Sequence, residues 1–141
     1  MGRILAIDYG LTRIGLALSD PLRIIASPYK TIQPKDEDAA LLALRQEIED
    51  NEVDIAVVGL PLSMSGEASE QTGIVRAFIE KLKAAVPVPV DEVDERLSSV
   101  EAIRVLHLKG VKTGHKKAEV DKTAAAIFLQ TYLDTGRYKS G

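Results

Sequence analysis

The order of the apolar segments limits this chain to an α/β fold. Short apolar runs come first, at 3–8, 14–19 and 23–32, and the gaps between them suit tight hairpins. Amphipathic helices are expected at 36–50, 66–85, from about 98, and at 118–133, with strands between them at 54–59 and 87–93. Hairpins pair strands antiparallel, whereas strand–helix–strand connections pair them parallel. The sequence therefore predicts a mixed five-stranded sheet with helices on both faces.

The length and composition suit a globular domain with an aliphatic core. The 141 residues predict one domain over 1–141, with 136–141 as a frayed tail. Cysteine is absent, which excludes disulfides and thiolate metal sites. No apolar run is long enough to cross a membrane, and the first ten residues suit a strand better than a signal peptide. We therefore expect a cytoplasmic protein with no membrane partner.

The charge is distributed unevenly along the chain. Residues 1–95 carry 9 basic and 17 acidic side chains, whereas residues 96–141 carry 9 basic and 4 acidic ones. The stretch 107–117 holds four lysines and no acid, so that Lys112, Lys116 and Lys117 are candidates for contacts with nucleic-acid phosphates. A solvated basic loop that binds nothing remains the alternative.

Three acidic residues stand where predicted elements begin or end. Asp8 ends the first strand, Glu95 follows the last strand, and Asp121 lies early in the last helix. Gathered carboxylates repel one another, and a bound divalent cation is the usual reason for a protein to tolerate that cost. Each residue also has an ordinary explanation, because an aspartate can cap a turn or interact with a helix dipole.

Other candidate residues lie in the turns beside these carboxylates. The loop residues Gly10, Gly59, Pro61 and Gly66 follow strands or precede a helix, where backbone can approach a ligand. The candidates for contact with nucleic acid in this region are Arg13 and Arg96. Arg13 could equally lie on a sheet face, and Arg96 could instead orient a carboxylate. The loop at 59–66 could be a plain strand–helix connection.

Four motifs resemble those of the YqgF/RuvX family, in the family's order and over nearly the whole chain. They are Asp8-x-Gly10-x-x-Arg13-Ile-Gly15, Gly59-x-Pro61 with Gly66, Asp94-Glu95-Arg96-Leu-Ser-Ser99, and Lys117-x-x-x-Asp121-x-x-Ala124-Ala125. The resemblance implies an RNase H-like fold and a nuclease that processes the 5′ end of precursor 16S ribosomal RNA. The family also carries the label of Holliday junction resolvase, which implies DNA as the alternative substrate.

The resemblance implies that Asp8, Glu95 and Asp121 are both the catalytic residues and the metal ligands. Mg²⁺ or Mn²⁺ suits such oxygen ligands, and we expect two ions. A non-catalytic nucleic-acid-binding protein and a phosphate-binding ATPase of the actin-like class are the rival interpretations. RNA is the expected partner, DNA is possible, and both a monomer and a homodimer remain open.

Overall fold

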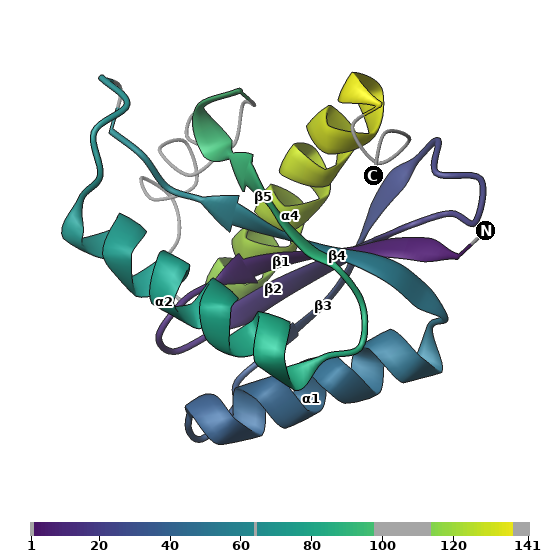
Figure 1. Cartoon of the computed structure of the whole chain (residues 1–141), viewed down its shortest axis with the longest axis horizontal. Coiled ribbons are helices and arrows are strands. Elements are labelled where there is room, and N and C mark those ends of the chain that lie inside the picture. Colours follow the sequence, from purple (N-terminus) through teal and green to yellow (C-terminus); the bar gives the residue numbers. More distant parts are fainter. Residues whose placement is uncertain (1, 64, 98–113, 137–141) are drawn as a thin grey trace.

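The computed structural model describes residues 2–63, 65–97 and 114–136, and of residues 114–118 only the backbone. Five strands form one sheet in the order β3-β2-β1-β4-β5 (Figure 1). The strands are β1 (Arg3–Tyr9), β2 (Ile14–Ser19), β3 (Ala26–Ile32), β4 (Val53–Leu60) and β5 (Val90–Asp94). The hairpins β1–β2 and β2–β3 are antiparallel, while β1, β4 and β5 run parallel. The predicted mixed five-stranded sheet is therefore confirmed.

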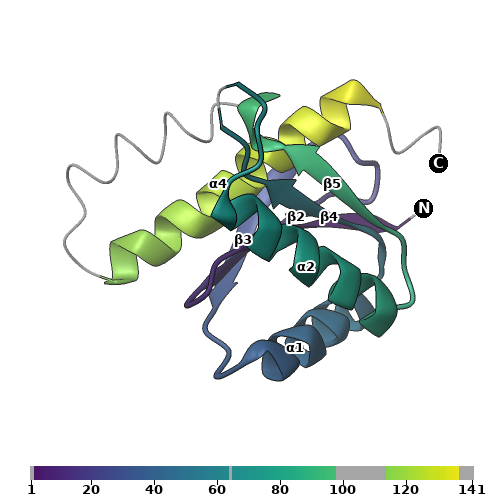
Figure 2. The same cartoon turned by 60° about the vertical axis from the view of Figure 1, so that its left-hand side comes forward.

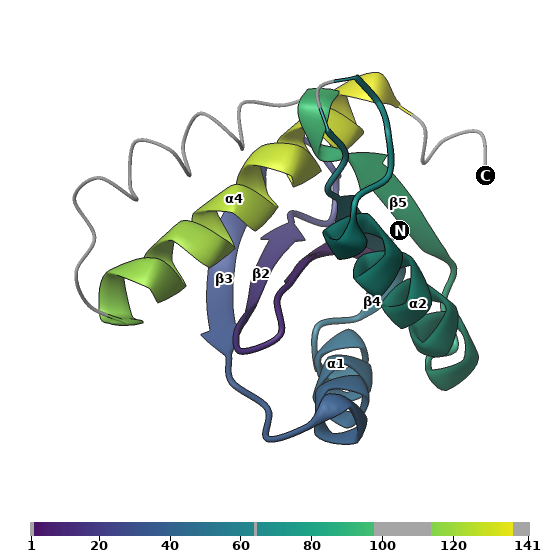
Figure 3. The ribbon, with the colours of Figure 1, turned by 90° about the vertical axis from the view of Figure 1, so that its left-hand side faces the viewer.

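Helices cover both faces of the sheet, as predicted. The helices α1 (Glu37–Asp50) and α2 (Glu70–Ala85) lie side by side on one face, and α4 (Gly114–Thr135) crosses the other over β2 and β3 (Figures 2 and 3). None of the helices in the described segments has the length and apolarity that a membrane crossing requires.

The sheet divides the core into two aliphatic layers, because the side chains of each strand alternate between its two faces. In β1, Leu5 and Ile7 pack with α1 and α2, whereas Ile4 and Ala6 pack with α4. Because successive side chains of a strand point to opposite faces, Asp8 belongs to the α4 face. It is 8% exposed.

The predicted starts of one helix and two strands were wrong, each for a local reason. The second helix begins at Glu70 and not at Gly66, because Ser69 and Thr72 form a capping box that fixes the first turn there. The third strand begins at Ala26 and not at 23, because the Asp20 carboxylate accepts hydrogen bonds from the preceding two amides. The last strand pairs only from Val90, after two prolines that cannot donate to a ladder.

The last helix is longer than predicted. It begins at Gly114 and not at 118, which places Lys116 and Lys117 in its first turns and not in a loop. It ends at Thr135, so the residues of the expected frayed tail after 136 lie outside the described part, as does the helix expected from about 98.

Candidate active site at the carboxyl edge of the sheet

The parallel strands β1, β4 and β5 end at one edge of the sheet (Figure 1), and two candidate carboxylates lie at or directly after these strand ends. Asp8 is the penultimate residue of β1, and Gly59 is the penultimate residue of β4. Glu95 begins the short 3-10 turn η1 (Glu95–Leu97) directly after β5. The carboxyl edge of an α/β sheet is where ligands usually bind, so the placement of Asp8 and Glu95 agrees with the prediction.

Glu95 reaches over the sheet at Gly59. The pairing of Ile7 with Val58 makes Asp8 and Gly59 neighbours on adjacent strands. A Cβ atom on Gly59 would lie 2.8 Å from Glu95 Oε1 and 2.6 Å from Phe128 Cε2. The Glu95 carboxylate therefore occupies the space above Gly59, beside the strand that carries Asp8.

The helix α4 is seated on the other side of Asp8. Gly15 pairs directly with Asp8 across the β1–β2 hairpin. A Cβ atom on Gly15 would lie 2.3 Å from both the carbonyl carbon and the carbonyl oxygen of Asp121. Only glycine permits so close an approach of two backbones. Ala124, Ala125 and Phe128 are fully buried on the same helix, as the predicted inward face requires.

The two glycines of the opening motif have different roles. Gly10 closes the tight turn of the hairpin, because a Cβ atom there would lie 2.6 Å from the carbonyl oxygen of Arg13. Gly15 lies inside β2, away from that turn. Its missing side chain makes room for the helix that carries Asp121. A glycine inside a strand is itself a signal of close backbone approach, and it could have identified this role.

Asp121 is held by Arg13 in this structure. Arg13 Nε donates to Asp121 Oδ2 over 2.9 Å, and the two side chains are 26% and 22% exposed. The sequence did not predict this pair, which joins residues 108 positions apart. Across the three described segments, no three His, Cys, Asp or Glu side chains gather closely enough to form a metal site. The structure brings Asp8 and Glu95 to the same edge of the sheet on either side of β4, while the Asp121 carboxylate is paired with the arginine.

The donor chemistry at this edge still suits a hard divalent cation. Asp8 and Glu95 both offer carboxylate oxygens on the α4 face, flanking Gly59. Mg²⁺ keeps several waters and usually takes only one or two protein carboxylates. The oxygen ligands that Asp8 and Glu95 offer therefore suit such an ion.

Arg96 is engaged with its neighbour Asp94. Arg96 donates from its backbone N to Asp94 Oδ1 over 2.9 Å and from its guanidinium to Asp94 Oδ2 over 2.6 Å. The hydrogen bonds from Arg96 hold the pKa of Asp94 below its usual value. A Cβ atom on Gly66 would lie 3.1 Å from the Arg96 guanidinium, and Gly66 has a positive φ of 86°. Arg96 thus binds the Asp94 carboxylate and lies against the loop after β4, as the alternative role of orienting a carboxylate requires.

The loop after β4 is tied to α2. The Thr72 hydroxyl donates to the Pro61 carbonyl, and the Ser69 hydroxyl accepts from the Thr72 amide over 3.3 Å. Ser63 Oγ accepts from the Glu67 amide over 3.1 Å. These hydroxyl groups therefore serve the loop's own structure, which favours the plain strand–helix connection.

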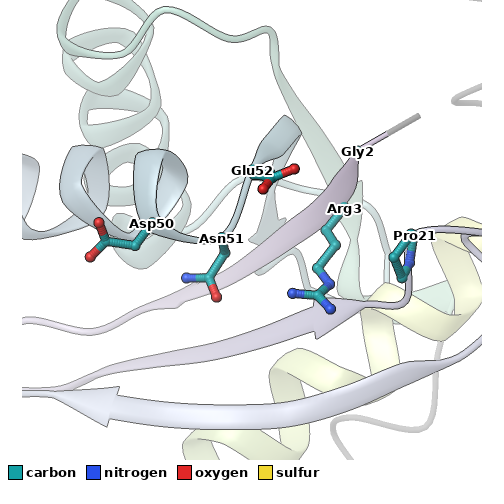
Figure 4. Close-up of a pocket in the computed structure, with 6 residues that line it drawn as sticks. All are labelled: Gly2, Arg3, Pro21, Asp50, Asn51 and Glu52. Atoms are coloured by element: carbon teal, nitrogen blue, oxygen red, sulfur yellow. The ribbon is translucent and has the colours of Figure 1, made fainter.

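Two further regions bear on the predicted contacts. Lys112 lies outside the described residues, and the structure describes only the backbone of Lys116 and Lys117. A hollow of about 160 Å³ lies at the opposite end of the sheet, and none of the candidate carboxylates lines it. Figure 4 shows the residues that do. They are Gly2, Arg3, Pro21, Asp50, Asn51 and Glu52.

The chain is similar to several known proteins. A family model described as "RuvX: Holliday junction resolvase" matches residues 2–135. A relative from Roseiflexus sp. (strain RS-1), named "Putative pre-16S rRNA nuclease", is 41% identical over 136 residues, which is 96% of each chain. A relative of the same name from Koribacter versatilis (strain Ellin345) is 44% identical over 94% of this chain and 87% of its own.

Solved structures share the fold. RuvC of T. thermophilus in complex with a Holliday junction substrate has a TM-score of 0.58 at 13% identity, with 96% of each chain covered. The fowlpox virus Holliday junction resolvase has a TM-score of 0.52 at 15% identity, covering 94% of this chain and 99% of that one. The RNase H-like fold implied by the sequence motifs is thereby confirmed. Given the match over nearly its whole length and relatives above 40% identity, the chain belongs to the RuvX family.

Proposed function

We propose that this protein is a metal-dependent nuclease that hydrolyses phosphodiester bonds at the 5′ end of precursor 16S ribosomal RNA during ribosome biogenesis. The support from comparison is that relatives above 40% identity, covered over most of their length, carry the name of a pre-16S rRNA nuclease. We further propose that residues 1–141 act as one nuclease domain in the cytoplasm, where such a substrate is found.

The observation that carries the proposal is the pair of glycines on either side of Asp8. Gly59 leaves room for the Glu95 carboxylate, and Gly15 leaves room for the backbone of Asp121. The Glu95 carboxylate and the backbone of Asp121 thus each lie against a glycine that neighbours Asp8 in the sheet. At the buried position of Asp8 a small apolar side chain would serve packing better than a carboxylate, because burying a charged group is costly.

We assign the roles of the site residues as follows. Asp8 and Glu95 would hold Mg²⁺ or Mn²⁺, with Asp121 as the third ligand and two ions as the expected complement. Bound there, the metal would supply an activated water and stabilise charge on the phosphate oxygens. Arg13, Lys112, Lys116 and Lys117 would neutralise backbone phosphates near the site.

A cleavage panel with Mg²⁺ or Mn²⁺ tests the proposal. The substrates are a precursor 16S rRNA 5′ end, an unrelated single-stranded RNA, single-stranded DNA and a four-way DNA junction. We expect cleavage of the precursor end, and Asp8→Asn should abolish it because the change keeps the size of the side chain but removes the charge that binds the cation. Circular dichroism shows whether the variant is folded. Cleavage by folded Asp8→Asn within about tenfold of the parent, equivalent to about 1.4 kcal/mol, would contradict the metal role of Asp8.

Holliday junction resolution is the second candidate, because the matching family model carries that description. Preferred cutting of the four-way junction would favour it over RNA processing. Symmetric cutting of two strands requires a two-fold dimer, so sedimentation of the active species separates the two functions further. Binding without cleavage of any substrate would indicate a non-catalytic nucleic-acid-binding protein.

A further inference from the structure

Arg13 and Asp121 form an ion pair inside the candidate site. We propose that Arg13 is the built-in counter-ion of this site: it holds Asp121 while no cation is bound, and a divalent cation competes with it for the same carboxylate. This inference rests on the proposed metal-dependent function. It adds a role for Arg13 in metal binding, beyond the phosphate contact predicted from the sequence.

Both partners of the pair are fixed by the backbone. Arg13 closes the turn that Gly10 makes possible, and Asp121 belongs to the segment of α4 seated on Gly15. Because Gly15 pairs with Asp8, the ion pair lies beside the strand end that carries the first carboxylate. Arg13 Nε and Asp121 Oδ2 are 2.9 Å apart, and about three quarters of each side chain is covered.

Arg13 and a divalent cation are both positively charged and compete for the Asp121 carboxylate. A carboxylate that is largely removed from water needs a positive partner, and in this structure Arg13 is that partner for Asp121. A divalent cation drawn to the same carboxylate would be repelled by the guanidinium at this range. Binding of either cation therefore disfavours the other at Asp121.

Replacement of Arg13 by a cation at Asp121 would also allow Arg13 to contact the substrate. Within the described segments, the guanidinium of Arg13 is bonded to Asp121 through Nε alone. Its terminal nitrogens form a planar fork that matches two phosphate oxygens. Release from Asp121 would free the whole guanidinium for the phosphate as the metal enters.

The test is calorimetric titration of the folded proteins with MnCl₂ alone, which needs no nuclease activity. Arg13→Gln should bind Mn²⁺ about fivefold more tightly than the parent, equivalent to about 1 kcal/mol. It should also melt at a lower temperature than the parent without metal, and this difference should shrink at saturating Mn²⁺. Arg13→Met, which keeps part of the aliphatic stem, serves if the glutamine variant does not fold.

The matched control is Lys122→Gln. Lys122 is adjacent to Asp121 in the chain and pairs with Glu119 over 3.0 Å, so the control removes one nearby positive charge without removing the Arg13 contact. We expect its affinity for Mn²⁺ to change by less than about twofold. Equal tightening in both variants would show a general charge effect and overturn the counter-ion role.

The remaining outcomes separate this inference from the proposed function. Unchanged Mn²⁺ affinity in the Arg13 variants, with a parent that binds metal and cleaves RNA, would overturn the counter-ion role alone. No binding of Mn²⁺ to any variant would overturn both the counter-ion role and the metal dependence.

Discussion

Gly15→Ala should displace the last helix from the sheet. The added Cβ would lie 2.3 Å from the Asp121 carbonyl group and 2.7 Å from the Lys122 amide nitrogen, whereas ordinary contacts begin at 3.4 Å. The shortfall of about 1 Å must be met by movement of backbone, because no flexible side chain is involved. Overpacking a core costs about 1–3 kcal/mol, and we expect the upper end here.

Thermal unfolding and cleavage measure the two consequences. A loss of about 3 kcal/mol should lower the melting temperature by about 6–12 °C in a chain of this size. A displacement of about 1 Å at a catalytic group can cost roughly 10²-fold in rate, so cleavage should fall at temperatures where the variant remains folded.

Gly73→Ala is the matched control. Gly73 lies inside α2, and a Cβ atom there would meet no atom of the described residues within 4 Å. Alanine is favoured over glycine in a helix by about 0.5–1 kcal/mol, so this variant should melt slightly above the parent and cleave at the same rate. A Gly15→Ala protein that melts within about 2 °C of the parent would refute the close seating of the helix.

Three further predictions concern the same edge of the sheet. Gly59→Ala should destabilise the fold less than Gly15→Ala, by about 1–2 kcal/mol in thermal unfolding, because side chains can move aside. Cleavage should still fall under the proposed role of Glu95, because the added Cβ would displace its carboxylate; unchanged cleavage would count against that role. Asp94→Asn should lower the melting temperature at neutral pH, because the pKa of Asp94 is depressed in the folded state. The difference from the parent should disappear in melting curves as the pH falls below about 4, where the carboxylate becomes protonated. Replacing Lys116 and Lys117 with alanine should flatten the slope of log affinity against log salt by about 0.7 per lost contact on single strands, with kcat unchanged; an unaltered slope would remove them from the binding surface.

The strands and most helices could be predicted because they depend on local patterns. The apolar run before Asp8 and the alternation after it are typical of strands, and the inward alanines of α4 follow helical spacing. The predicted start of α2 at Gly66 was wrong because the capping box of Ser69 and Thr72 sets the first turn of the helix. The late start of β5 could have been predicted from Pro87 and Pro89, which precede it.

By itself the sequence determined the fold class, the family motifs and the three acidic candidates, since each of these depends on residue type and on spacing along one segment. Only the tertiary structure decided that Asp8 has glycines on both sides, because strand register is set by pairing between distant segments. It likewise decided that Asp121 meets Arg13 across 108 positions. Local patterns fix which face of an element is apolar, but the neighbours of a charged group depend on how the faces of separate elements are brought together.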